Sequence, residues 1–201
     1  MGGRYPLPRV LIKQPINMKK SLQISLKRVL LLVAGIFLLT TIAQAQESKK
    51  DRRMVEDCED AQKEFIRTDS LMKNLFASAY GYVIFPSVGK GAIGVGGASG
   101  GGAVFTGGKA IGRAQMTQVT VGFQLGGQAY REVIFFQDKE TLDRFKENNF
   151  EFSAQASAVA AKAGASGNIK YANGVMVFTQ QKGGLMYEAS IGGQKFKFTA
   201  F

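Results

Sequence analysis

Residues 81–109 read GYVIFPSVGKGAIGVGGASGGGAVFTGGK. The apolar run at residues 82–85 is typical of a strand, and we expect Pro86 to end it. Between Tyr80 and Tyr130 the chain carries 15 of its 25 glycines and no Asp or Glu. Glycine costs conformational entropy inside a strand, so this density indicates bends or close approach of two backbones in a curved sheet. The stretch has too few polar side chains to be typical of a catalytic loop.

The N-terminal part has the three regions of a secretory signal peptide. A basic segment begins at Met18, the apolar residues 29–39 follow, and Ala-Gln-Ala at 43–45 supplies the small residues that a signal peptidase reads. We therefore expect translation to start at Met18, cleavage before Gln46, and residues 1–45 to be an N-terminal extension and signal peptide. A segment retained as a membrane anchor is the alternative.

Most of the positive charge belongs to this export segment. Residues 1–45 hold seven of the 26 Lys and Arg residues and no acid, which leaves 19 basic against 15 acidic residues in the remainder. The net charge of that remainder is +4 rather than +11. We therefore expect no nucleic-acid partner. Because of the export signal, we expect the protein in the periplasm or at the periphery of the outer membrane.

The composition also restricts the chemistry. The chain has no histidine and a single cysteine, Cys58, so a zinc site and an intramolecular disulfide are both excluded. Acidic residues flank Cys58, and its helical spacing from apolar neighbours favours a buried core residue over a reactive thiol. An intermolecular disulfide is the alternative. We expect no metal and no cofactor.

Residues 46–79 are predicted to be helical. Their apolar side chains recur at spacings of three, four and seven: Met54, Cys58, Ala61, Phe65, Met72 and Leu75. Thr68, Asp69 and Ser70 interrupt the pattern with residue types that cap helices, which predicts two helices over about 48–67 and 70–78.

Residues 80–201 are predicted to be a Gly-rich β body, which makes 46–201 a single domain. The capping residue Asp138 predicts a short helix over 138–148, and the Ala/Gly-rich residues 158–168 are predicted to be a loop. Strands are expected near 80–86, 91–97, 101–106, 115–124, 127–137, 150–157, 174–180, 185–192 and 195–200. The predicted fold is α+β: an N-terminal helical pair packed on a curved, Gly-rich antiparallel sheet, half-barrel or sandwich-like, with one short helix inserted between strands.

The partial matches to catalytic and nucleotide-binding motifs in this sequence are incomplete. Residues 89–94 match G-x-G-x-x-G, but more glycine follows where a dinucleotide site needs a helix. Residues 107–109 resemble the end of a P-loop, yet Ala110 stands where Ser or Thr must meet magnesium. The carboxylates of the predicted 138–148 helix are read as its solvated face. We expect no catalytic residues and no enzymatic activity.

Several segments, taken in order, resemble a known family. AYGYVIFPSVGKGAIGVGGASGGGAVF, QVTVGFQLGGQAYREVIFF, TLDRF and FEFSAQASAVA are together similar to the SYLF lipid-binding domain, which is also described as an actin-binding domain in eukaryotic endocytic adaptors. The resemblance covers roughly residues 60–200. It implies a non-enzymatic domain that binds membrane lipids, with a basic N-terminal helix taking part in contact with the membrane.

The expected role is binding of lipid or of a membrane surface in the bacterial envelope, with anionic phospholipid as the partner. The candidate lipid-binding residues are Lys49, Lys50, Arg52, Arg53, Lys90, Lys109 and Arg113. One alternative is a structural module that binds an envelope protein. A less favoured one is a hydrolase, in which Asp138, Glu140 or Glu188 would converge with a basic group in a pocket.

Overall fold

The structure is a computed structural model, and it describes residues 48–93, 95–121, 128–148, 150–153, 157–160, 162–182 and 189–201. Residues 48–201 form one compact unit. The predicted signal segment lies outside the described residues. Within those residues, no helix combines the length and the apolar character needed to span a membrane.

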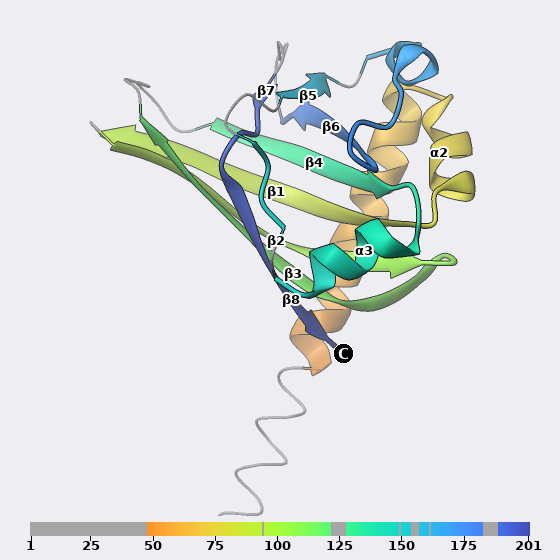
Figure 1. The fold of residues 1–201 in the computed structure, drawn as a ribbon, viewed down its shortest axis with the longest axis horizontal. Coiled ribbons are helices and arrows are strands. Elements are labelled where there is room, and N and C mark those ends of the chain that lie inside the picture. Colours follow the sequence, from red (N-terminus) through yellow and green to blue (C-terminus); the bar gives the residue numbers. More distant parts are fainter. Residues whose placement is uncertain are drawn as a thin grey trace, which may run out of the picture. The chain divides into compact units, whose positions relative to one another are not determined.

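Within its described residues, the unit combines four helical segments with one eight-stranded sheet (Figure 1). A helix over residues 48–68 comes first. The further elements are α2 (Met72–Ser78), β1 (Gly81–Ile93), β2 (Val95–Thr106), β3 (Lys109–Val121), β4 (Gln128–Phe136), α3 (Lys139–Lys146), β5 (Ser157–Ala160), the 3₁₀ turn η1 (Ala165–Asn168), β6 (Val175–Gln181), β7 (Ala189–Ser190) and β8 (Gln194–Ala200).

The strand order is β7-β5-β6-β4-β1-β2-β3-β8. The predicted α+β class with N-terminal helices and a curved sheet is confirmed. The sheet is mixed rather than wholly antiparallel, because β5 pairs with β6 in parallel. The chain between them includes η1, so it is long enough to return to the same end of the sheet.

The expectation that Pro86 ends the first strand is wrong. β1 continues through Pro86 to Ile93, and its pairing with both neighbours shifts register at this point. Between the pairs Ile84–Ala103 and Ser87–Gly101, two residues of β1 oppose only Gly102 of β2. This is a β-bulge, which lets a residue without an N–H group stay within a strand. The two strands predicted at 91–97 and 101–106 are instead the end of β1 and a continuous β2.

One face of the sheet, called the outer face here, is covered by the 48–68 helix and α2. Cys58 and Phe65 of the helix are fully buried there against Ile84 and other side chains of the sheet. The Cys58 thiol donates to the Ile84 carbonyl at 3.2 Å, and burial raises the pKa of this thiol to about 12. The prediction of a core cysteine is confirmed.

The opposite face, called the inner face, packs against α3 and the segment 150–152. Leu142 and Phe145 of α3 are buried there, as their spacing predicts. Asp138 caps α3, since its side chain accepts a hydrogen bond from the Thr141 amide at 2.8 Å. The sheet therefore has an apolar core on each face, and the side chains of each strand alternate between the two cores.

The later part of the chain departs most from the predictions. Residues 150–153 form no strand, although Glu151 makes an isolated bridge to Lys195. Strand structure begins instead at Ser157, inside a stretch of small residues. Asp69, at the predicted break between the helices, accepts from the Leu71 amide at 3.1 Å and from the Ser166 amide at 2.8 Å. This buried carboxylate therefore ties η1 to the helical pair.

Candidate functional site

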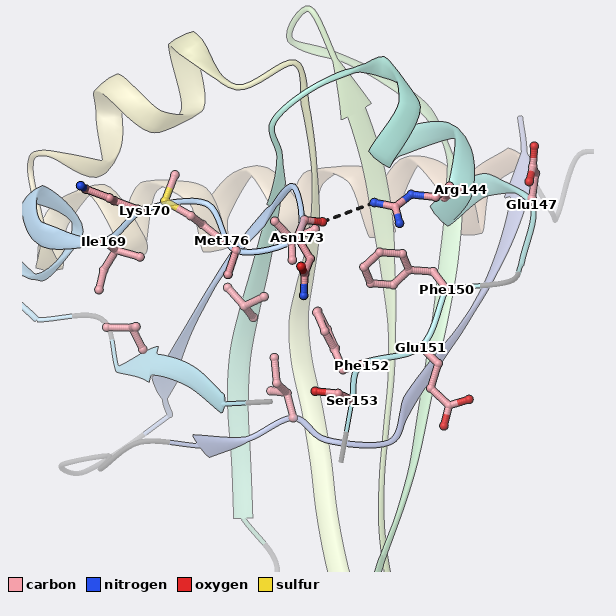
Figure 2. A pocket seen from close by; sticks show the side chains of 15 residues that line it. Arg144, Glu147, Phe150, Glu151, Phe152, Ser153, Ile169, Lys170, Asn173 and Met176 are labelled. Carbon is pink, nitrogen blue, oxygen red and sulfur yellow. Dashed lines mark hydrogen bonds between the residues drawn. The ribbon is translucent and has the colours of Figure 1, made fainter. Parts of the chain in front are cut away.

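The inner face borders a pocket of about 750 Å³ between α3, the 150–153 segment and β6 (Figure 2). Most of its floor is apolar. The lining residues are Arg144, Glu147, Phe150, Glu151, Phe152, Ser153, Val159, Ile169, Lys170, Ala172, Asn173, Val175, Met176, Val177 and Ile191. A cavity of this size and character is typical of sites for small apolar ligands.

One wall of the pocket is held rigidly by an aromatic cluster. The ring of Phe150 lies 5.9 Å from Phe145 and 5.3 Å from Phe152, measured between centroids. Phe152 in turn packs on Phe196 of β8 at 5.6 Å. Backbone hydrogen bonds from Phe152 to Gln194 and from Gly193 to Phe152 fix the same segment against the start of β8. The irregular residues 150–153 are therefore anchored although they belong to no strand.

The opposite rim is a tight turn before β6. Asn173 and Gly174 both have positive φ, 53° and 82°, as a two-residue hairpin turn requires. Arg144 of α3 donates to the Asn173 carbonyl at 3.3 Å (Figure 2). A Cβ at Gly174 would collide with the Thr141 side chain, so glycine allows α3 to pack closely on this turn. The Asn-Gly dipeptide is the sequence signal that could have revealed this rim.

The rim carries charges of both signs, but they point in different directions. Figure 2 shows Glu147 and Glu151 directed away from the pocket, whereas Arg144 extends across its edge toward Asn173. Glu151 is paired with Lys195 at 3.4 Å. Arg144 and Lys170 are the cationic residues among those that line the pocket. Arg144 is directed along the pocket edge toward Asn173, whereas the Lys170 side chain points away from Arg144 (Figure 2). Sequence reasoning missed both of them.

A polar cluster lies on the inner face beside the pocket. Tyr130 and Glu132 of β4 point to this face, as do Thr179 of β6 and Gln194 of β8, and all four are buried. The Gln194 Nε2 donates to Glu132 Oε2 at 3.0 Å, and Glu132 and Thr179 are direct register partners. Burial raises the pKa of Glu132 to about 7, although the Gln194 contact opposes the shift.

The cationic residues predicted at the helix start lie on the outer side of the domain, apart from this pocket. Lys49, Lys50, Arg52 and Arg53 are exposed at the beginning of the 48–68 helix. Asp51 of the same turn pairs with Arg113 of β3 at 3.3 Å, so the structure brings Arg113 to the helix start.

The other two predicted cations do not join this group. Ile84 of β1, Ala103 of β2 and Arg113 of β3 lie side by side in the sheet. Lys109 precedes Arg113 by four residues, so it lies about 13 Å away along β3. Lys90 lies six residues beyond Ile84 on β1, about 20 Å away in the other direction. On β8, Lys197 is exposed and pairs in register with Gln115, two residues from Arg113 on the same face. The alternation in residues 194–200 could have indicated this extra cation.

A second, smaller pocket of about 280 Å³ lies between the 48–68 helix and the bulge of β1. Charged groups dominate its lining: Asp57, Asp60, Glu64, Arg131 and Lys182. Burial and the nearby Arg131 lower the pKa of Lys182. This polar pocket does not suit an apolar ligand.

The two described acids proposed for a hydrolase, Asp138 and Glu140, line neither of these pockets. Asp138 is engaged in capping α3, and hydrogen bonds from Thr141 lower its pKa. Glu140 is exposed on the first turn of α3. Glu188 lies outside the described residues.

Comparison with known proteins agrees with the resemblance seen in the sequence. A stretch of 72 residues, 36% of the chain, is 33% identical to Beta cell expansion factor A of Aeromonas veronii. The match spans 28% of the length of that relative. Residues 117–199 match the family described as "Ysc84: Las17-binding protein actin regulator", and they include every residue of the larger pocket and of the polar cluster. Residues 117–199 of this chain are therefore similar to the Ysc84 family, in agreement with the SYLF resemblance of the sequence.

Proposed function

We propose that this chain is a non-enzymatic lipid-binding domain whose larger pocket takes the apolar chain of an anionic amphiphile. The observation that carries the proposal is the pairing of a largely apolar cavity of about 750 Å³ with the cation Arg144 at the turn before β6, while Lys170 lines the same cavity. Apolar walls favour transfer of a hydrocarbon chain out of water. The cations match a carboxylate or phosphate head that stays near solvent.

The family match supports a binding role. The family is described by the protein that it binds and by actin regulation, and the SYLF resemblance adds lipid as a ligand. A lipid-binding domain is favoured over a protein-interaction module because the pocket is concave and largely apolar. Saturable binding to vesicles of anionic lipid would argue against the protein-interaction alternative.

The location of this activity follows from the predicted signal peptide. A chain that is exported and cleaved before Gln46 would meet anionic phospholipids in the periplasm or at the outer membrane. The basic helix start would then guide the domain to the membrane surface, where each cation contributes about 1 kcal/mol. The pocket would accept the chain of a single lipid molecule.

Neutralising the pocket mouth is expected to weaken binding of an anionic ligand. In the double variant Arg144→Gln/Lys170→Gln, affinity for dodecanoate should fall by roughly threefold to tenfold, since a partly exposed ion pair contributes up to about 1 kcal/mol. Calorimetric titration of the full-length protein measures this. Lys73→Gln on α2 is the matched control, because Lys73 is exposed and lies outside the pocket. If the double variant bound dodecanoate as tightly as the wild type, Arg144 and Lys170 would have no part in binding the anionic head.

Removing the helix-start cations tests the route to the membrane. With Lys49, Lys50, Arg52 and Arg53 all replaced by alanine, binding to phosphatidylglycerol vesicles should weaken at low salt. The difference from the wild type should shrink as salt is added, because the Debye length is only about 8 Å at physiological ionic strength. Co-sedimentation across a salt series gives the result. Equal binding of both proteins at every salt concentration would place the membrane contact elsewhere.

A further inference from the structure

The buried polar cluster contains more hydrogen-bonding capacity than its own members satisfy. Within the described part of the chain, three of its atoms have no hydrogen-bond partner: Glu132 Oε1, Thr179 Oγ1 and Gln194 Oε1. These three residues have a relative solvent exposure of 0%. An unsatisfied buried polar atom costs free energy comparable to a lost hydrogen bond. Three such atoms in one cluster leave it with unused capacity for hydrogen bonds.

The cluster is contiguous with the apolar pocket along β6. Val175, Val177 and Thr179 alternate onto the inner face, and the first two line the pocket. Thr179 is therefore the next side chain beyond the pocket floor, about 13 Å from Val175 along the strand.

The same continuity is seen on the opposite wall. The amide of Phe152, a pocket residue, donates to the Gln194 carbonyl at 3.2 Å. Ile191, also a pocket residue, accepts at its carbonyl from the Gln194 amide at 3.2 Å. Gln194 thus joins the pocket wall through its backbone and the polar cluster through its side chain. Residues on both sides of the pocket are therefore continuous through the backbone with the polar cluster.

We propose that Glu132, Thr179 and Gln194 form the inner end of the ligand pocket and bind a hydroxyl group carried on an apolar chain. A hydroxyl fits because it both donates and accepts: it can donate to a Glu132 or Gln194 oxygen and accept from the Thr179 hydroxyl. A plain alkyl chain would leave all three atoms unsatisfied. An ammonium group would bring a charge between walls of Phe and Val, where desolvation opposes it.

The dimensions set the position of the hydroxyl. The anionic head lies at the turn before β6, beside Arg144, and the polar end lies about 13 Å further along the strand. An extended chain advances about 1.2 Å per bond, as an extended peptide backbone does. The hydroxyl is therefore expected about ten to twelve bonds from the head group. This inference rests on the proposed lipid-binding function, since it assigns a ligand class to the same pocket.

The test compares two ligands that differ only in this group. The full-length protein is titrated with 12-hydroxydodecanoate and with dodecanoate, and we expect the hydroxylated chain to bind at least about tenfold tighter. The Thr179→Val variant, which keeps the side-chain shape, should lose most of this preference. Thr199→Val is the control, because Thr199 is exposed on the outer face of β8 and should leave the preference unchanged.

The two proposals fail in different ways. If dodecanoate binds the wild type as tightly as the hydroxylated chain or more tightly, the cluster holds water only and this inference is overturned, while the proposed lipid-binding function stands. If neither ligand binds, both proposals are overturned. The comparison of the two ligands on the wild-type protein tests the inference even if the Thr179→Val variant does not fold, which circular dichroism would show.

Discussion

Replacing Gly102 by alanine is expected to destabilise the domain by about 3 kcal/mol or more, and to prevent folding if the sheet cannot shift. A Cβ at this position would overlap the Ile84 carbonyl oxygen and lie 2.9 Å from the Ile84 carbonyl carbon. Both atoms are main chain, so no rotation of a side chain relieves the overlap. Gly102 is the one residue of β2 that faces the two-residue bulge at Pro86. The bulge and the glycine therefore depend on each other.

The neighbouring glycines provide the controls. A Cβ at Gly101 meets only the Gln115 side chain, at 3.6 Å, and a Cβ at Gly89 meets no atom within 4 Å. Alanine at either position should leave stability unchanged or raise it by about 0.5–1 kcal/mol, because glycine loses more entropy on folding. Urea unfolding of the three variants measures the contrast. An unfolding midpoint for Gly102→Ala equal to that of Gly101→Ala would contradict the assignment.

The helices and the role of the glycine-rich stretch could be predicted from the sequence because their causes are local. The spacing of Cys58, Phe65 and their apolar neighbours reflects one buried helix face, and that face is where the structure places them. The density of glycine correctly indicated close approach of backbones, as Gly102 shows. Pro86 misled the prediction because a bulge in the neighbouring pairing, rather than a strand end, accommodates it.

The larger pocket could not be predicted in this way. Its walls come from α3, the irregular residues 150–153 and the turn before β6, which are distant in the sequence and meet only through packing. No periodic pattern marks residues 150–153, since aromatic contacts rather than a strand ladder hold them. Four of the candidate cations named from the sequence form a run at residues 49–53, whereas Arg144 and Lys170 belong to no run of positive charges and gave no such signal.

Glu132, unlike Arg144 and Lys170, is marked as a candidate functional residue by the sequence pattern around it. Tyr130, Glu132, Ile134 and Phe136 occupy alternate positions of β4, so they share one face of the sheet. Three of the four are apolar or aromatic, which marks the face as buried and the carboxylate as an exception. A charged residue in the apolar phase of a strand is a candidate functional residue on physical grounds.

The ionisation of Glu132 is expected to make the domain less stable as pH rises. Burial raises its pKa from the ordinary value of 4.5 to about 7, so the folded state binds a proton that the unfolded chain has already released. Stability from this group is fully present below pH 4.5, falls as pH rises toward 7, and is lost above it. The total is about 3 kcal/mol, since each unit of pKa corresponds to about 1.4 kcal/mol.

Glu132→Gln is expected to remove this dependence, because the amide keeps the shape and cannot ionise. At pH 8 the variant should exceed the wild type in stability by up to about 3 kcal/mol, and at pH 5 the difference should be below about 1 kcal/mol. Urea unfolding at pH 5, 6, 7 and 8 measures both proteins. Glu151→Gln is the control, since Glu151 is exposed and its pair with Lys195 contributes little. If the stability of the wild type and of Glu132→Gln changed with pH in the same way, the Glu132 carboxyl would titrate alike in the folded and unfolded chain. Burial would then not raise its pKa.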